Sequence, residues 1–96
     1  MAKAKKVSAS GIITSAPAKL KAWVISTDGT NDVTAISLYN GTDNTGAEVI
    51  PTYDVLAAAK GISGATGIDV DCPNGIYIEF TTAGTAEAVV YFEDIG

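Results

Sequence analysis

The chain has 96 residues, a formal net charge of −5 at pH 7, one cysteine and no histidine. This length suits one small domain, and the lack of histidine beside a lone cysteine excludes the usual nucleophilic triads and zinc sites. The acidic balance predicts no nucleic-acid partner, and no apolar run reaches the roughly 18 residues of a membrane span, so no membrane partner is expected either.

The amino-terminal segment is basic, in contrast to the rest of the chain. It contains Lys3, Lys5 and Lys6, which are followed by a run of small residues, Ser-Ala-Ser-Gly, at positions 8–11. We interpret residues 1–9 as an N-terminal arm and residues 10–96 as the single β-sandwich domain. The lysines would attract an acidic surface on a partner, where the arm becomes ordered. The alternative is that they fold back onto the acidic domain itself.

Alternating hydrophobicity predicts a strand over residues 19–26, a turn at Asp28–Gly29 and a second strand over 32–39, together a hairpin. In the first strand, one face carries Leu20, Ala22 and Val24, and the other carries Lys19, Lys21, Trp23 and Ile25. Because Trp23 and Ile25 share the lysine face, we expect that face to be partly covered, by a neighbouring element or by another chain.

The middle of the chain is less regular. Residues 40–46 form a polar loop of turn-favouring residues, and a short strand follows over 47–52, which Pro51 places towards a sheet edge. Residues 52–61 allow two interpretations. Thr52 as N-cap and Lys60–Gly61 at the end are typical of a short helix, whereas pairing with a neighbour would make the segment a strand or an extended crossover.

The carboxyl-terminal third predicts a three-stranded meander over residues 68–72, 76–80 and 86–92, with a turn at Pro73–Asn74–Gly75. In the last strand, Val89 and Tyr91 share a face with glutamates. With the earlier segments this gives seven to eight short strands separated by Gly, Asn, Asp and Pro. The sequence therefore predicts an all-β fold, a small antiparallel β-sandwich or jelly roll.

A search for chemistry yields weak candidates. Cys72 falls on the inward face of its strand, which favours a buried structural thiol. Asp28 to Asp32 and the Asp69/Asp71 pair supply oxygen atoms, but calcium takes six to eight ligands, so each group would need help from other loops. We expect no metal, no cofactor and no enzymatic activity.

Two stretches resemble a known class of proteins. Residues 35–46, Ala-Ile-Ser-Leu-Tyr-Asn-Gly-Thr-Asp-Asn-Thr-Gly, are similar to a strand-then-Asn-Gly-Thr segment of small tailed-phage virion proteins. Residues 73–78, Pro-Asn-Gly-Ile-Tyr-Ile, and 88–92, Ala-Val-Val-Tyr-Phe, are similar to the close of the same proteins. The resemblance implies a β-sandwich or jelly-roll subunit, used as head decoration (cement) or head-fibre base and often trimeric. It carries over no site residues.

The sequence thus predicts a non-enzymatic structural virion protein, a capsid decoration or cement subunit that binds the major capsid lattice. Its expected partners are itself, as a homotrimer, and a major capsid or other virion protein, and its expected location is the virion, assembled in the host cytoplasm. The alternative is a carbohydrate- or surface-binding β-sandwich module using the Asn/Thr-rich loops. The candidate partner contacts are Lys3, Lys5, Lys6, Trp23, Ile25, Val89 and Tyr91.

Overall fold

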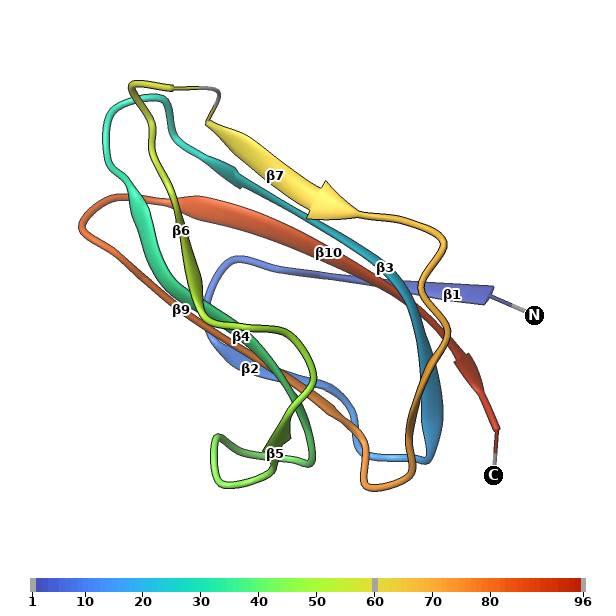
Figure 1. Ribbon diagram of the computed structural model, residues 1–96. Helices are drawn as coiled ribbons and strands as arrows, with labels where there is room; N and C mark the ends of the chain where they lie inside the picture. The colour runs from blue at the N-terminus through green and yellow to red at the C-terminus, as the bar shows by residue number, and fades with distance from the viewer. Residues whose placement is uncertain (1, 60, 96) are drawn as a thin grey trace.

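The computed structural model describes residues 2–59 and 61–95, and over these residues it is an antiparallel two-sheet sandwich without helices (Figure 1). Sheet A contains β1 (Ala2–Val7), β10 (Ala86–Asp94), β3 (Ala18–Thr27), β7 (Ile62–Ala65) and β8 (Val70–Cys72). Sheet B contains β2 (Gly11–Thr14), β9 (Ile76–Thr82), β4 (Val33–Asn40), β5 (Ala47–Glu48) and β6 (Tyr53–Val55). The predicted all-β antiparallel sandwich is confirmed, with ten short strands where seven to eight were expected.

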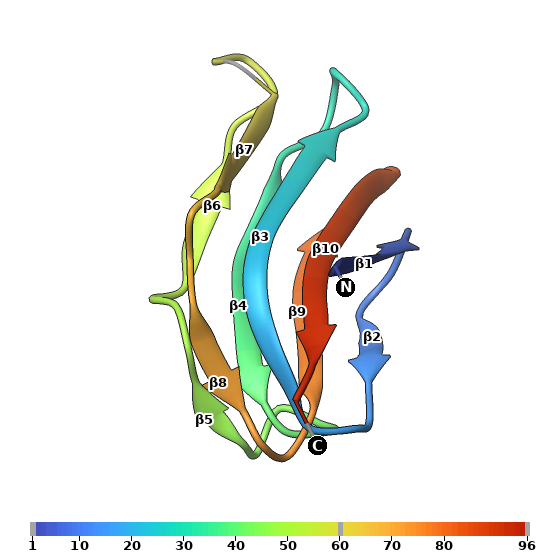
Figure 2. The same ribbon diagram turned by 90° about the vertical axis from the view of Figure 1, so that its right-hand side faces the viewer.

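The core lies between the two sheets, and in Figure 2 β3 and β10 of sheet A lie in front of β4 and β9 of sheet B. Aliphatic side chains fill most of it, and both sheets contribute along their whole length. Its fully buried large members are Leu20 and Ile25 from β3, Val33, Ile36 and Leu38 from β4, Ile76 and Ile78 from β9, and Val90 from β10. Because successive strand residues point to opposite faces, this core leaves one outer face on each sheet.

Strands β3 and β4 do not form the predicted hairpin. They belong to different sheets, and the Thr27–Asp32 connection crosses from sheet A to sheet B. The Asp28 carboxylate closes this arch by accepting the backbone N–H groups of Thr30 and Asn31, both at 2.8 Å. An arch of this kind joins layers, whereas a tight two-residue turn joins neighbours in one sheet.

The predicted three-stranded meander in the carboxyl-terminal third is also wrong, because its consecutive strands belong to different sheets. β8 and β10 lie in sheet A and β9 lies between them in sequence but in sheet B. Each turn in this region therefore carries the chain across the sandwich. Alternation identifies which face of a strand is buried, but it does not say to which sheet the strand belongs, because strands of both sheets turn their apolar face towards the same core.

Residues 53–55 form β6, which settles the open choice over residues 52–61 in favour of a strand followed by a turn. Val55 is buried opposite Val33 of β4. The Asp54 carboxylate accepts the N–H of Ala35 at 3.0 Å, where β4 bulges and Ala35 has φ 54°. Tertiary pairing thus overrides the local helix signals. Lys60 lies outside the described residues.

The expected arm is instead largely part of the sheet. Residues 2–7 form β1, which pairs with β10 from Ala2 opposite Glu93 to Val7 opposite Ala88. Val7 packs against the core, and basic β1 lies beside acidic β10, which favours the pairing. Residue 1 lies outside the described residues.

The edges of both sheets are protected against pairing with another chain. Lys3 and Lys5 lie opposite the buried Phe92 and Val90, so β1 has lysines on its inward side. The opposite edge of sheet A is split between β7 and β8, and that of sheet B between β5 and β6. Inward charges and short, interrupted edge strands both discourage sheet extension. The broad outer faces remain as the larger exposed surfaces of a molecule measuring 40 × 25 × 19 Å.

Candidate interaction surface

A β-bulge in β3 decides which candidate residues reach the surface. Phe92 of β10 lies opposite Leu20, and Tyr91 lies opposite Ala22, so Lys21 has no partner in this register. The extra residue reverses the alternation of inward and outward side chains beyond it. Leu20 is therefore buried before the bulge and Ile25 is buried after it.

Trp23 and Ile25 consequently lie on the inward side of β3, so the expectation that they share the lysine face is wrong. Ile25 is fully buried, and Trp23 packs against the core. The indole Nε1–H of Trp23 donates to the Tyr53 hydroxyl at 2.9 Å, which joins sheet A to sheet B inside the sandwich. The run Ala-Trp-Val-Ile at 22–25 breaks strict alternation, and this break is the sequence signal that indicates a bulge.

Val89 and Tyr91 do lie on the outer face of sheet A, as predicted. Tyr91 is 40% exposed and has Ala4 on one side and Ala22 on the other. Val89 lies opposite Val24 on the neighbouring strand. Directly opposite residues share a face, so the outer surface gathers one apolar set across four strands. We name this set the A face: Ala4, Ala22, Val24, Ile62, Gly64, Val89 and Tyr91.

Gly64 keeps this face flat. A Cβ at Gly64 would collide with the Trp23 carbonyl oxygen and lie 2.9 Å from the Val24 Cα. Strand β7 therefore lies close against β3 at a point where a side chain would push the strands apart. Ile62, two residues earlier and on the same side, is 53% exposed. The A face is thus a shallow surface of small and aliphatic groups around one aromatic ring.

Ion pairs surround the A face at both ends. Lys6 pairs with Glu87 at one end, and Lys21 pairs with Asp69 at the other. The Lys19 Nζ lies 3.8 Å from the Asp71 carboxylate, and the Lys3–Asp94 pair lies at the edge of the sheet on the inward side of β1. The Asp69 pairing raises the pKa of Lys21 and lowers the pKa of the Asp69 carboxyl, because each partner stabilises the charged form of the other.

The lysines follow the alternative in which they fold back onto the domain. Lys3 and Lys6 each contact an acid of β10, and Lys5 lies exposed at the sheet edge opposite Val90. These pairs are solvent-exposed, so each contributes little to stability. They leave the polar border of the A face carrying both signs of charge.

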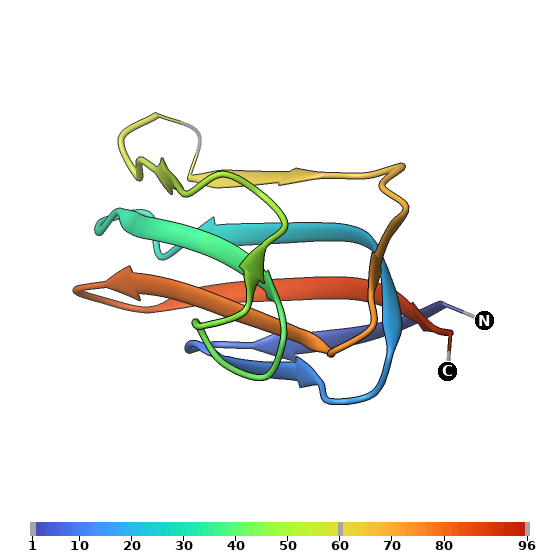
Figure 3. The same cartoon turned by 60° about the horizontal axis from the view of Figure 1, so that its bottom comes forward.

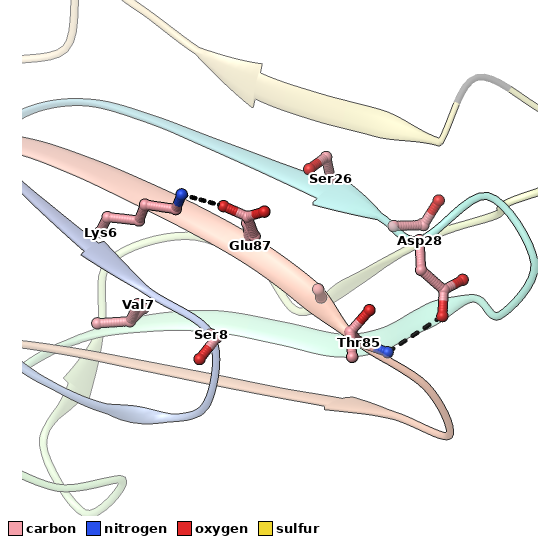
Figure 4. Close-up of a pocket in the computed structure, with 9 residues that line it drawn as sticks. Lys6, Val7, Ser8, Ser26, Asp28, Thr85 and Glu87 are labelled. Atoms are coloured by element: carbon pink, nitrogen blue, oxygen red, sulfur yellow. Dashed lines mark hydrogen bonds and ion pairs between the residues drawn. The ribbon is translucent and has the colours of Figure 1, made fainter.

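A groove of about 510 Å³ lies at one end of the A face, where β1 leaves β10 (Figure 4). Hydroxyl groups of Ser8, Ser26 and Thr85 line it together with the Lys6–Glu87 pair. Asp28 lies at its far end and accepts the Thr85 N–H at 3.1 Å. With the two bonds inside its own arch, this contact ties the β3–β4 connection to the β9–β10 turn.

These donors hold the pKa of the Asp28 carboxyl far below its usual range, chiefly through the N–H groups of Asn31 and Thr30. A carboxyl with a lowered folded-state pKa stabilises the fold above its unfolded value of about 3.9, and that contribution is lost as the pH falls through the folded value. We therefore expect Asp28→Asn to have a lower melting temperature than the wild type at pH 7. The difference between the two melting temperatures should narrow as the pH falls below about 4.

Thermal melts of both proteins from pH 7 to pH 2 measure this gap. Asp71→Asn is the matched control, because Asp71 is exposed and makes one long contact, with Lys19. Its melting temperature should stay close to that of the wild type at pH 7. A melting gap for Asp28→Asn that is absent at pH 7, or that widens in acid, would contradict the assignment.

The two acidic groups considered for calcium have other partners. Asp28 is engaged by backbone donors, and Asp69 and Asp71 face lysines. Among the described residues no group of three or more His, Cys, Asp and Glu side chains is placed to hold a metal ion. Cys72 is buried, and burial raises the pKa of its thiol. No helix in the described part of the chain is long and apolar enough to cross a membrane.

The outer face of sheet B differs in character. Tyr39 and Tyr77 are adjacent on β4 and β9, with ring centroids 6.3 Å apart. The Glu79 carboxylate accepts the Tyr39 hydroxyl at 3.2 Å and the Asn44 amide at 3.1 Å. The five strands of sheet B contain no lysine. We name the outer residues Ile12, Tyr39, Glu48, Tyr77 and Glu79 the B face.

Comparison with known proteins identifies no relative. No protein-family model, no curated protein and no solved structure matches the chain. The surfaces described above and the resemblance of the two sequence stretches are therefore the observations that bear on function.

Proposed function

We propose that the chain is a non-enzymatic structural subunit that associates with copies of itself and attaches to a larger assembly. The observation that carries this proposal is the A face, an apolar centre with a border of paired charges. Interfaces between proteins have this anatomy, with an apolar, aromatic-containing core inside a polar rim. Tyr91, at the centre of its row, has the residue type and position of an interface anchor.

The size of the molecule supports this use of the A face. The exposed surface is 5008 Å², so an interface of about 800 Å² on each partner would cover roughly a sixth of it. Because charges and short strands at the sheet edges discourage pairing with another chain, we expect such an interface on one of the broad faces. The A face carries both signs of charge at its border, whereas the charged residues of the B face, Glu48 and Glu79, are both acidic and would repel those of a second copy.

The position in the assembly is proposed from the resemblance to small tailed-phage virion proteins. In this proposal the chain is a virion subunit, of the capsid decoration or cement kind, that forms a homotrimer and binds a major capsid or other virion protein. A thin sandwich with an exposed apolar face is suited to such a role.

The test is a charge placed at the centre of the A face. We expect wild-type protein to self-associate and Tyr91→Asp to weaken this association about a hundredfold, because truncating or charging a central aromatic anchor typically costs about 2–4 kcal/mol. The exposed position of Tyr91 on the sheet should leave folding intact. Sedimentation over a concentration series measures the association, and circular dichroism checks the fold.

Ile12→Asp is the matched control, because Ile12 is 47% exposed on the B face. It introduces the same charge on the opposite side of the sandwich and should associate like the wild type. A wild type that stays monomeric, or a control that dissociates while Tyr91→Asp does not, would contradict the proposed use of the A face.

A second function, carbohydrate or surface binding, would use the B face. The Tyr39–Tyr77 pair with the nearby Asn44 and Glu79 supplies aromatic and polar groups on one surface. Carbohydrate binding is the second candidate because Glu79 already accepts hydrogen bonds from Tyr39 and Asn44. These bonds leave fewer free polar groups to orient a sugar.

A further inference from the structure

Strand β1 is attached to the sandwich almost entirely through its backbone. Residues 2–6 are exposed, and Val7 alone among β1 side chains packs against the core. The side-chain contacts of β1 with β10 that remain are the exposed ion pairs Lys3–Asp94 and Lys6–Glu87. Since exposed pairs contribute little, β1 is held mainly by its ladder with β10.

A hinge of small residues joins β1 to the rest of the chain. Ser8, Ala9 and Ser10 are exposed and connect β1 in sheet A to β2 in sheet B. Grooves lie on both sides of this hinge, one of about 510 Å³ beside β3 and one of about 470 Å³ beside Phe80, and Ser8 lines both. Ser8 and Ala9 therefore border open grooves, and Ser10 ends the hinge.

The chain is anchored immediately after the hinge. The Ser10 hydroxyl donates to the Phe80 carbonyl at 3.0 Å and accepts the Phe80 N–H at 2.9 Å. From Ser10 onward the chain is thus fixed to β9, and from Gly11 it continues as β2. Displacement of β1 would rotate residues 2–7 about the hinge and leave the two layers of the core in place.

The edge of β10 that β1 covers matches a basic strand. Glu87, Glu93 and Asp94 supply negative charge along it, and the backbone groups of β10 that now pair with β1 would become a free edge once β1 left. Figure 3 shows β1 at the margin of its sheet, beside β10. A chain that replaced β1 in the same register would restore the backbone ladder, and lysines at the same positions would restore the two ion pairs.

We propose that β1 exchanges between copies, so that β1 of each chain pairs with β10 of a neighbouring copy. An identical strand from a second copy restores every contact of the closed chain, and exchange then costs little beyond rearranging the hinge. Passing β1 to the next chain around a ring closes a trimer, and reciprocal exchange closes a dimer. This inference rests on the self-association in the proposed function and specifies how the copies are linked.

The experiment uses the registered pair Ala2 and Glu93, which lies at the border of sheet A, two residues along the strands from the Ala4–Tyr91 pair. Ala2→Cys and Glu93→Cys are made in separate chains, one of them isotopically labelled, mixed, refolded together from denaturant and treated with a short thiol cross-linker. Cys72 stays in place because it is buried, and wild-type protein under the same treatment measures its background. Mass spectrometry then identifies cross-links between labelled and unlabelled chains.

Exchange predicts strong mixed cross-linking between positions 2 and 93, at least tenfold above a control mixture of Ala2→Cys with Thr45→Cys, a residue exposed in the β4–β5 loop. The double variant Ala2→Cys/Glu93→Cys should form covalent oligomers as well. If the double variant cross-links only within its own chain and the mixture stays at the control level, exchange is overturned. The proposed function survives that result when the wild type still associates through Tyr91, so the two failures are distinguishable.

Discussion

Ile78→Ala is expected to cost about 2–5 kcal/mol of unfolding free energy, because it leaves a cavity in the middle of the core. Ile78 is fully buried on β9, with Leu38 on one side and Gly11 on the other as its register partners. A domain of this size is stable by roughly 5–10 kcal/mol. The variant should therefore be close to unfolding at 37 °C, and urea titration followed by tryptophan fluorescence of Trp23 measures the loss.

Ile12→Ala is the control for this result, because it removes the same atoms from a side chain that is 47% exposed on the outer side of the adjacent strand. We expect Ile12→Ala to change the free energy of unfolding by no more than about 0.5–1 kcal/mol. Equal losses for the two variants would mean that the inward and outward faces of sheet B are assigned wrongly.

Gly75→Ala is expected to destabilise the protein by about 3–5 kcal/mol through backbone strain and overpacking together. Gly75 has φ 102°, which side chains rarely adopt. An added Cβ would also lie 2.5 Å from the Thr14 carbonyl oxygen and 3.3 Å from that of Gly41. The Gly75 carbonyl accepts the Gly41 N–H at 3.1 Å, so movement to relieve the clash would break a contact between two loops.

Gly29→Ala separates the two causes. Gly29 has a similar φ of 88°, but an added Cβ meets nothing within 4 Å. Gly29→Ala should lower the free energy of unfolding by about 1–2 kcal/mol, which is the cost of the left-handed backbone alone. Chemical denaturation of both variants gives the difference that is due to crowding, and a loss at Gly29 as large as that at Gly75 would show that crowding is absent.

The fold class could be predicted because alternation and turn residues are local properties. Residues 76–80 alternate regularly, residues 19–26 and 32–39 alternate over part of their length, and each range falls on a strand of the structure. The assignment of strands to sheets could not be predicted in the same way. Asp28–Gly29 suits a hairpin turn by composition, but the Asp28 carboxylate binds three backbone N–H groups and closes an arch between layers.

The candidate surface was predicted in part. Val89 and Tyr91 follow regular alternation from buried Val90 and Phe92, so their outward position could be derived. Trp23 and Ile25 could not be placed, because one extra residue at the bulge reverses the face of every residue after it. The neighbours of Tyr91 on the A face come from β1 and β3, which are distant in sequence and meet it only through the sheet register.

The central claim is that the A face is the surface covered on self-association, and hydroxyl-radical footprinting tests it most directly. Tyrosine oxidation is compared at a concentration where the protein is dispersed and at one where it has associated. The account predicts that Tyr91 becomes protected upon association while Tyr39 and Tyr77 on the B face keep their reactivity. Protection of Tyr39 and Tyr77 with an unchanged Tyr91 would contradict it.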